Sequence, residues 1–346
     1  TEEQIDRMVA ILDNPLAHVE ASLAQPRGPT PALSGQPLDY GRCERLPCHE
    51  RCRGTRHEGL ERGSHVIVDS HQHFWDLEEV EYPWLVPDYG PIYRTFKPDE
   101  LEPQLAAAGI DRTVLVQAAN SFEDTDSMLR HAERCEWIGA VVGWVPLEDA
   151  AATSAALDRY LVNPRFKGIR HLNNEEADPD WLVRPAVIDG LKVLEERRVP
   201  YDVIAVYPLH LGHVPALAQA CPGLSMVIDH LSKPPIASGD YDAWKVDMRA
   251  AAEHPTVSAK ISGLNTAADW ERWTGADLVE SIGFALEVFG PQRLMFGSDW
   301  PVAILAGDYA KVWAETNAAL DELGVEGNDR AAILGGNAAR FYDIER

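Results

Sequence analysis

The 346-residue chain is poor in basic residues and has no long apolar run. It contains 31 lysines and arginines against 55 aspartates and glutamates, which gives a formal net charge of −24. Such an acidic chain is not expected to bind nucleic acid or an anionic membrane surface. No stretch approaches the roughly 18 apolar residues of a membrane-spanning helix, and no secretory signal is recognisable. We therefore expect a soluble, cytoplasmic protein that acts on a small molecule.

Cysteine is scarce as well, with five residues in the chain. Cys135 and Cys221 stand alone in helix-patterned stretches and are interpreted as small buried apolar residues. Cys43, Cys48 and Cys52 lie close together, but their spacing matches no common zinc pattern. A cysteine-rich loop is the simpler interpretation, and a metal or disulfide knot stays open. So low a count favours the cytoplasm.

The composition changes near residue 65. Residues 3–13 carry apolar side chains at helical spacing, and residues 26–37 are rich in proline, glycine, serine and threonine. Residues 42–62 are rich in arginine and poor in apolar residues. We expect residues 1–65 to form a loosely attached N-terminal extension that is partly helical or disordered. Its first helix could instead dock on the main domain or on another subunit, so a homo-oligomer stays open.

From residue 66 onwards, short apolar runs alternate with helix-patterned stretches. The predicted strands are 66–71, 113–118, 139–145, 166–171, 201–206, 225–230, 257–262 and 293–297. The predicted helices between and after them are 98–108, 124–136, 151–161, 181–198, 212–220, 241–253, 276–289 and 308–323. Strands joined by helices form parallel sheets, and eight such units predict an α/β fold, a (β/α)8 TIM barrel, over residues 66–346.

An open doubly wound sheet is the competing architecture. That fold usually carries a glycine-rich phosphate turn after its first strand, whereas here the first predicted strand ends in Ser70-His71-Gln72-His73. A further helical segment, residues 328–342, is expected to close or brace the barrel.

Polar side chains stand at the ends of the predicted strands, where a TIM barrel places its active site. His71 and His73 lie two residues apart on a strand and therefore point to the same side. The other strand ends contribute Gln117, Asn120, Trp144, Arg170, His171, Tyr207, His210, His230, Lys260, Ser262 and Asp299. Because an unpaired buried polar group costs about 1–3 kcal/mol, this distribution indicates a site at the mouth of the barrel.

The motifs around these residues form a specific series. They read VDSHQHFWD, YPWL, FKGIRH, VIDHLSKPP, AKISGL, LMFGSDWPV and GGNAARFYDI. In series they resemble the amidohydrolase superfamily, and within it the amidohydrolase-2 branch of sugar lactonases and 2-pyrone-4,6-dicarboxylate lactonase. The resemblance spans residues 66–346. It implies a hydrolase that opens a lactone ring, with sugar-acid lactones favoured over muconolactone or pyrone dicarboxylate types.

The resemblance also implies catalytic roles. Asp299 matches the family aspartate that takes a proton from the attacking water, a role that suits a carboxylate beside histidines. His71, His73 and His230 would polarise the lactone carbonyl or help to hold a metal. Metal-bearing relatives usually have a histidine after strand five, where this chain has Tyr207, and the metal-free pyrone branch has a tyrosine there. Two alternatives therefore stay open: no cofactor, or one divalent metal, preferably zinc, held by His71, His73 and Asp299.

Five residues are candidate substrate contacts: Arg170, Tyr207, Lys260, Trp84 and Arg94. Arg170 and Lys260 could bind a hydroxyl or carboxylate, although Arg170 could equally form an ion pair at the strand end. Trp84 and Arg94 lie in the loop after the first strand, which is either a substrate lid or ordinary packing.

Two further polar residues lie at or just after the end of the sixth predicted strand. Asp229 precedes His230 and is expected to point the opposite way. Lys233 lies either over the site or in solvent.

Two other functions stay open at this stage. One is a metal-dependent decarboxylase of the same superfamily, which requires zinc and a carboxylate-binding arginine. The other is a non-catalytic ligand-binding or assembly barrel, in which residues 1–65 mediate the interaction. The intact set of aspartate and histidines favours an enzyme, and the sequence alone does not identify the lactone.

Overall fold

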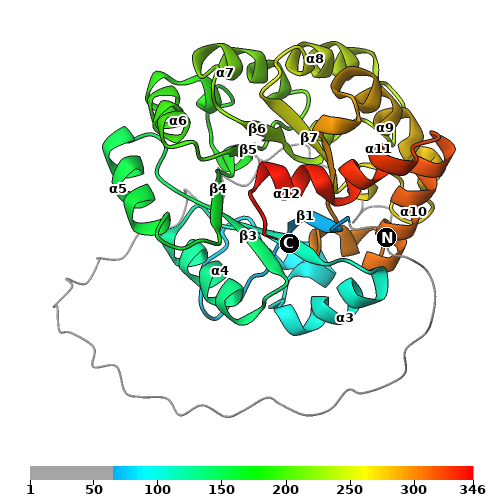
Figure 1. Ribbon diagram of the computed structural model, residues 1–346, viewed down its shortest axis with the longest axis horizontal. Coiled ribbons are helices and arrows are strands. Elements are labelled where there is room, and N and C mark those ends of the chain that lie inside the picture. The colour runs from blue at the N-terminus through cyan, green and yellow to red at the C-terminus, as the bar shows by residue number, and fades with distance from the viewer. Residues whose placement is uncertain (1–64, 346) are drawn as a thin grey trace.

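The computed structural model describes residues 65–345, in which eight parallel strands form one sheet in the order β1 to β8. The barrel closes between β8 and β1, where the N–H of Asp299 donates to the carbonyl of His71 (2.8 Å). The N–H of His73 likewise donates to the carbonyl of Trp300 (2.7 Å). Figure 1 shows the helices as an outer ring around these strands. The predicted TIM barrel is confirmed.

The strands coincide with the predicted apolar runs but are shorter. They are β1 (Val68–Gln72), β2 (Arg112–Val116), β3 (Ile138–Gly143), β4 (Phe166–Arg170), β5 (Tyr201–Val203), β6 (Met226–Ile228), β7 (Val257–Ile261) and β8 (Leu294–Phe296). β5 and β6 have three residues each, because the chain leaves the sheet early to form the loops at the barrel mouth. Of the polar residues predicted at strand ends, His71, Arg170 and Lys260 lie within β1, β4 and β7, whereas Tyr207, His230 and Asp299 lie in loops.

Each strand is followed by a helix, as predicted. The helices are α3 (Pro98–Ala108), α4 (Phe122–Arg134), α5 (Ala150–Tyr160), α6 (Pro185–Arg197), α7 (Val214–Ala220), α8 (Asp242–Ala252), α9 (Gly275–Phe289), α10 (Tyr309–Glu322), α11 (Gly327–Ala331) and α12 (Asn337–Phe341).

The helices begin where the sequence supplies a cap or a proline. Thr274 and Asp277 form a capping box at the start of α9, and the Asp149 side chain accepts from the N–H of Ala152 at α5. α6 starts four residues later than predicted, because Arg184 precedes a proline and is held in an extended conformation.

A segment that follows α11 fills the amino-terminal end of the barrel, and we call residues 337–344 the C-terminal plug. Figure 1 shows its helix α12 lying across one end of the barrel. Ala338, Tyr342 and Ile344 of the plug form one apolar cluster with the interior residues Val68, Val114, Val116, Ala140, Val142, Val227 and Met295. The turn before the plug runs so close to β1 that a Cβ at Gly335 would lie 2.0 Å from the Val66 carbonyl oxygen. The predicted closing helix at residues 328–342 is therefore present, divided into α11, a π-helical turn (Ala332–Gly336) and α12.

Some expectations fall outside this description. The extension at residues 1–65, apart from His65, and the cluster of Cys43, Cys48 and Cys52 lie outside the described residues. Cys135 is half-buried and Cys221 is buried, and both are free thiols. Within residues 65–345, none of the helices is long and apolar enough to cross a membrane.

The plug ends in a hydrogen bond that we expect to contribute to stability. The Tyr342 hydroxyl donates to the carboxylate of Asp202 on β5, at 2.9 and 2.8 Å from its two oxygens, and both residues are buried. Replacing Tyr342 by Phe removes a donor from a buried carboxylate, so we expect the free energy of unfolding to fall by about 1–3 kcal/mol. Chemical denaturation measures this change. The control is Tyr93→Phe, whose side chain is exposed. Equal stability of the two variants would contradict the assignment.

Candidate active site

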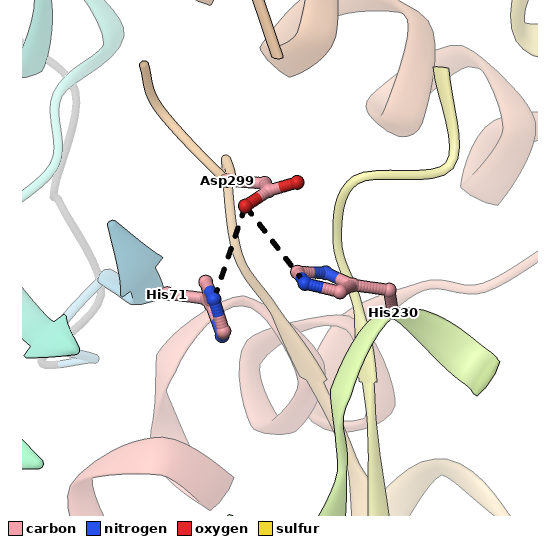
Figure 2. A group of neighbouring side chains, drawn as sticks. All are labelled: His71, His230 and Asp299. Carbon is pink, nitrogen blue, oxygen red and sulfur yellow. Dashed lines mark ion pairs between the residues drawn. The ribbon is translucent and has the colours of Figure 1, made fainter. Parts of the chain in front are cut away.

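Four polar side chains meet at the carboxyl end of the barrel. His71 lies in β1, His73 directly follows it, His230 follows β6, and Asp299 follows β8. Figure 2 shows the Asp299 carboxylate facing the imidazoles of His71 and His230. The Oδ1 atom of Asp299 lies 3.8 Å from His71 Nε2, 3.5 Å from His73 Nε2 and 3.8 Å from His230 Nε2. The four residues expected to be catalytic are therefore brought together.

The hydrogen bonds of His71 and His73 assign their tautomers. His73 Nδ1 lies 2.7 Å from the Val116 carbonyl oxygen, which can only accept, so Nδ1 carries the proton. His71 Nδ1 faces the Asp229 carboxylate (3.2 Å), and its Nε2 faces Arg170 (3.3 Å), which can only donate. Lys260 Nζ also lies 3.1 Å from His71 Nδ1. Lys260 donates preferentially to the carboxylates next to it, because an ionised oxygen is a stronger acceptor than an imidazole nitrogen. Both Nε2 atoms therefore present lone pairs.

These two lone pairs face each other across 3.1 Å, next to the Asp299 carboxylate. Three acceptors at this separation repel one another unless a cation lies between them. Zinc bonds of about 2.0–2.1 Å to nitrogen and oxygen place tetrahedral donors roughly 3.3–3.4 Å apart, close to the distances found among these three side chains. His71, His73 and Asp299, the predicted metal set, therefore fit a divalent cation.

A second combination is also close enough to bind a metal. His71, His230 and Asp299 offer donor atoms that all lie within 4.8 Å of one another. His230 Nδ1 contacts the Ser262 hydroxyl (2.8 Å), so each of the three imidazoles has a partner at its second nitrogen. Such outer contacts orient metal-binding histidines.

Burial controls the charges in this group. It lowers the pKa of His230 to about 4, and it lowers the pKa of His71 and His73 below the ordinary value. Burial alone would raise the pKa of Asp299. The charge that His230 carries once it is protonated in acid, the hydrogen bond with His73 and the charge of Lys233 together hold the pKa of this carboxyl well below its usual range. The site thus combines neutral imidazoles with an ionised carboxylate.

The chain after β6 adopts an unusual backbone. His230, Leu231, Ser232 and Lys233 have φ values of 56°, 47°, 65° and 53°, so four successive residues other than glycine are left-handed. This turn directs both Asp229 and His230 into the barrel. The expectation that Asp229 points away was wrong, because the alternation of a strand ends at Ile228.

Asp229 belongs to a buried ion network beneath the site. Its carboxylate pairs with Lys260 (3.1 Å), Arg170 (3.1 Å) and His71 (3.2 Å). Lys260 also pairs with Asp202 (2.5 Å), and Arg170 donates to the Gln117 carbonyl. The cations hold the pKa of Asp229 well below its ordinary value against the effect of burial.

The network changes the expected roles of two residues. Lys260 is 0% exposed and Arg170 is 4% exposed, and both pair with carboxylates; the Arg170 Nε–H has no partner among the described residues, but it is buried. We therefore propose that Arg170 and Lys260 support His71 and Asp229, in place of the substrate contacts suggested by the sequence.

The loop after β1 covers one side of the site. Trp84 donates its indole N–H to the Ala118 carbonyl (2.7 Å) and packs edge-on against Trp75, whose ring lies 6.5 Å from that of His73. Arg94 instead stacks on Phe96 and pairs with Glu100 (2.8 Å) on α3. Its guanidinium is thus engaged with protein groups, which argues against the predicted substrate contact.

Tyr207 lies next to the left-handed turn. It is half-buried, and its N–H donates to the Ser232 carbonyl (3.0 Å). Substrate contacts of Trp84 and Tyr207 stay predictions.

Sequence reasoning left four residues of this region without a role: Asp229, Lys233, Ser262 and Gly263. Lys233 lies 3.7 Å from Asp299 Oδ2, and Ser262 contacts His230. Gly263 has a φ of 57°, and a Cβ there would lie 2.4 Å from Asp299 Oδ2. The available signals were the lysine before two prolines in VIDHLSKPP and the glycine in AKISGL.

Comparisons with known proteins show which family the chain belongs to and which proteins it is similar to. The family model described as an amidohydrolase matches residues 68–344. A protein of Burkholderia ambifaria named L-fucono-1,5-lactonase is 41% identical over 292 residues, covering 81% of this chain and 96% of that protein. A protein of Burkholderia multivorans with the same name is 36% identical over 295 residues, covering 80% and 96%.

A solved structure extends the similarity to the fold. It is the crystal structure of an amidohydrolase from Burkholderia multivorans with bound zinc. That protein is 33% identical, its TM-score is 0.76, and the match covers 81% of this chain and 100% of that one. The resemblance carried by the motifs is confirmed.

Gly263 provides a test of the proposed metal set. Its replacement by Ala forces Asp299 and His230 to move, so we expect zinc affinity to fall by roughly 10–100-fold, the usual effect of disturbing groups around metal ligands. Isothermal titration calorimetry measures this affinity. Gly239→Ala is the matched control: its φ is 72°, but a Cβ there meets no atom within 4 Å. Both variants carry a backbone cost of about 1–2 kcal/mol, and only Gly263→Ala should lose zinc. Equal zinc affinity in the two variants would contradict the assignment.

Proposed function

The chain belongs to the amidohydrolase family, and on that premise we propose that it hydrolyses a sugar-acid lactone, with L-fucono-1,5-lactone as the leading substrate. One structural observation supports this most. Asp299 is ionised and buried, its Oδ1 faces three imidazoles, and its Oδ2 has no hydrogen-bond partner among the described residues. An ionised carboxylate with one open oxygen can take a proton from an attacking water.

The tautomer of each histidine determines whether it can bind a cation or donate to the lactone carbonyl. His71 and His73 present lone pairs, which suit a cation and cannot donate to a carbonyl oxygen. His230 contacts the Ser262 hydroxyl, which can accept or donate, so His230 is free to present its Nε2–H to the lactone carbonyl. We assign His71, His73 and Asp299 to a zinc ion and His230 to carbonyl polarisation. When bound, zinc supplies Lewis-acid activation and an acidified water.

The contacts of Arg170 and Asp299 also bear on the two alternative functions, a decarboxylase and a non-catalytic barrel. A decarboxylase needs an arginine free to bind a carboxylate, and Arg170 is already paired with Asp229, which favours the lactonase. A non-catalytic barrel gives no reason to bury an ionised Asp299 among neutral imidazoles. Location in the cytoplasm and a homo-oligomer stay predictions.

Asp299→Asn tests the proposed base. We expect kcat for L-fucono-1,5-lactone to fall by about 10²–10⁴-fold, the usual contribution of a positioned base. Acid release followed with a pH indicator measures turnover. Asp189→Asn on α6, where the carboxylate is 61% exposed, is the control and should keep full activity. Undiminished turnover by Asp299→Asn would reject the mechanism.

Removal of metal tests the role of zinc. We expect about one zinc per chain in the purified protein, loss of turnover after chelation, and recovery on adding zinc. His73→Ala should lower the zinc content, because it removes a lone pair of the set. His213→Ala should not, because His213 faces Asp180 (3.2 Å) rather than this set. Full activity in zinc-free protein would favour the metal-free alternative.

A further inference from the structure

Lys233 occupies a distinctive place at the site. Its ammonium donates to the Thr266 hydroxyl (2.8 Å) and to the Gly263 carbonyl (3.2 Å), and it lies 3.7 Å from Asp299 Oδ2. Its side chain is 26% exposed, whereas Arg170 and Lys260 are buried and paired with carboxylates. Of the three cations around the cluster, Lys233 is therefore the one that a bound molecule can reach.

The backbone is strained to deliver this side chain. Lys233 is the last of the four left-handed residues after β6, and the first of them is His230. Such conformations cost of order 1–3 kcal/mol each in residues other than glycine and persist mainly at functional sites. One strained turn thus positions two polar groups around the same carboxylate, His230 near Oδ1 and Lys233 near Oδ2.

The two oxygens of Asp299 therefore face different partners. The imidazoles lie on the Oδ1 side, where we assigned His71 and His73 to the cation and His230 to the carbonyl oxygen of the lactone. The Oδ2 side holds Lys233, and two of its three ammonium protons are used by Thr266 and Gly263. The third proton remains available on the side away from the carbonyl oxygen.

We propose that Lys233 is a catalytic residue that donates a hydrogen bond to the ring oxygen as this oxygen leaves the lactone. The inference rests on the proposed lactone hydrolysis. Water oxygen bonds to the carbonyl carbon while Asp299 takes one water proton, and the π electron pair of the C=O bond moves onto the carbonyl oxygen. This pair then re-forms the C=O bond as the bond from the carbon to the ring oxygen breaks. The pair of the broken bond stays on the ring oxygen, and the proton on Asp299 passes to it. Lys233 keeps its own protons throughout.

The chemistry of sugar lactones explains the need for such a donor. Their leaving group is an alkoxide, a strong base, so ring opening is slow unless the developing charge is stabilised. A fixed ammonium in a partly dry site supplies that stabilisation without reorganisation. It also offsets the repulsion between Asp299 and the carboxylate product.

Lys233→Met tests this role through the fate of the tetrahedral intermediate. We expect kcat for L-fucono-1,5-lactone to fall roughly 100-fold, as for a lost donor to developing charge. KM and zinc content should stay close to wild type, because Lys233 is not assigned to the metal. In H₂¹⁸O, an intermediate that opens slowly returns to lactone more often. Recovered lactone should therefore carry at least about tenfold more ¹⁸O per turnover than with wild type.

Lys245→Met is the matched control, since Lys245 is similarly exposed (30%) and pairs with Glu280 on the outer face. It should behave as wild type in every measurement. Lys233→Gln, which keeps a neutral donor, replaces the Met variant if that variant does not fold. We expect it to show a smaller loss of kcat and a correspondingly smaller rise in ¹⁸O, still above wild type.

Several results would overturn the inference. An unchanged kcat excludes a catalytic role, and a lower kcat with unchanged ¹⁸O per turnover means that Lys233 acts before ring opening. If wild type hydrolyses no sugar lactone, the proposed function itself fails, a result distinct from both.

Discussion

The buried carboxylate of Asp229 is the interaction on which the centre of the barrel depends. It pairs with Lys260, Arg170 and His71, which belong to three different strands, in a region closed to water. Removal of one partner from a buried ion pair typically costs about 3–5 kcal/mol, because the remaining charge loses its compensation. The same contacts orient the His71 imidazole, so packing and chemistry depend on one set of charges.

The barrel and the central cluster could be predicted because their signals are periodic or local. Apolar runs at regular intervals indicate eight strands, and the strand ends place His71, His73, His230 and Asp299 at one edge. The expectation for Asp229 failed because this residue lies beyond β6, where alternation no longer applies. Asp229 turns inwards because four left-handed residues follow it, and no local pattern announces such a turn. Burial of Arg170 and Lys260 depends on partners from distant strands, which a single segment does not reveal.

The hydrogen-bond partners of the imidazoles support the proposed use of His71 and His73 as metal ligands over direct contact with the substrate carbonyl. A carbonyl oxygen at His73 and a carboxylate at His71 keep the protons on Nδ1, and the outward nitrogens can then only accept. Tyr207, in the position where metal-bearing relatives usually have a histidine, made a metal-free site attractive from the sequence. The group bound at Nδ1 of each imidazole is therefore a better guide to cation binding than the number of histidines at the strand ends.

The C-terminal plug has a consequence for biosynthesis. Ala338, Tyr342 and Ile344 fill the amino-terminal end of the barrel, yet the ribosome makes them after all eight strands. A nascent chain that has just completed β8 still lacks the hydroxyl that binds Asp202 and the apolar groups that cover the interior valines. Closure of the barrel interior therefore has to wait until the chain through Ile344 has left the ribosome.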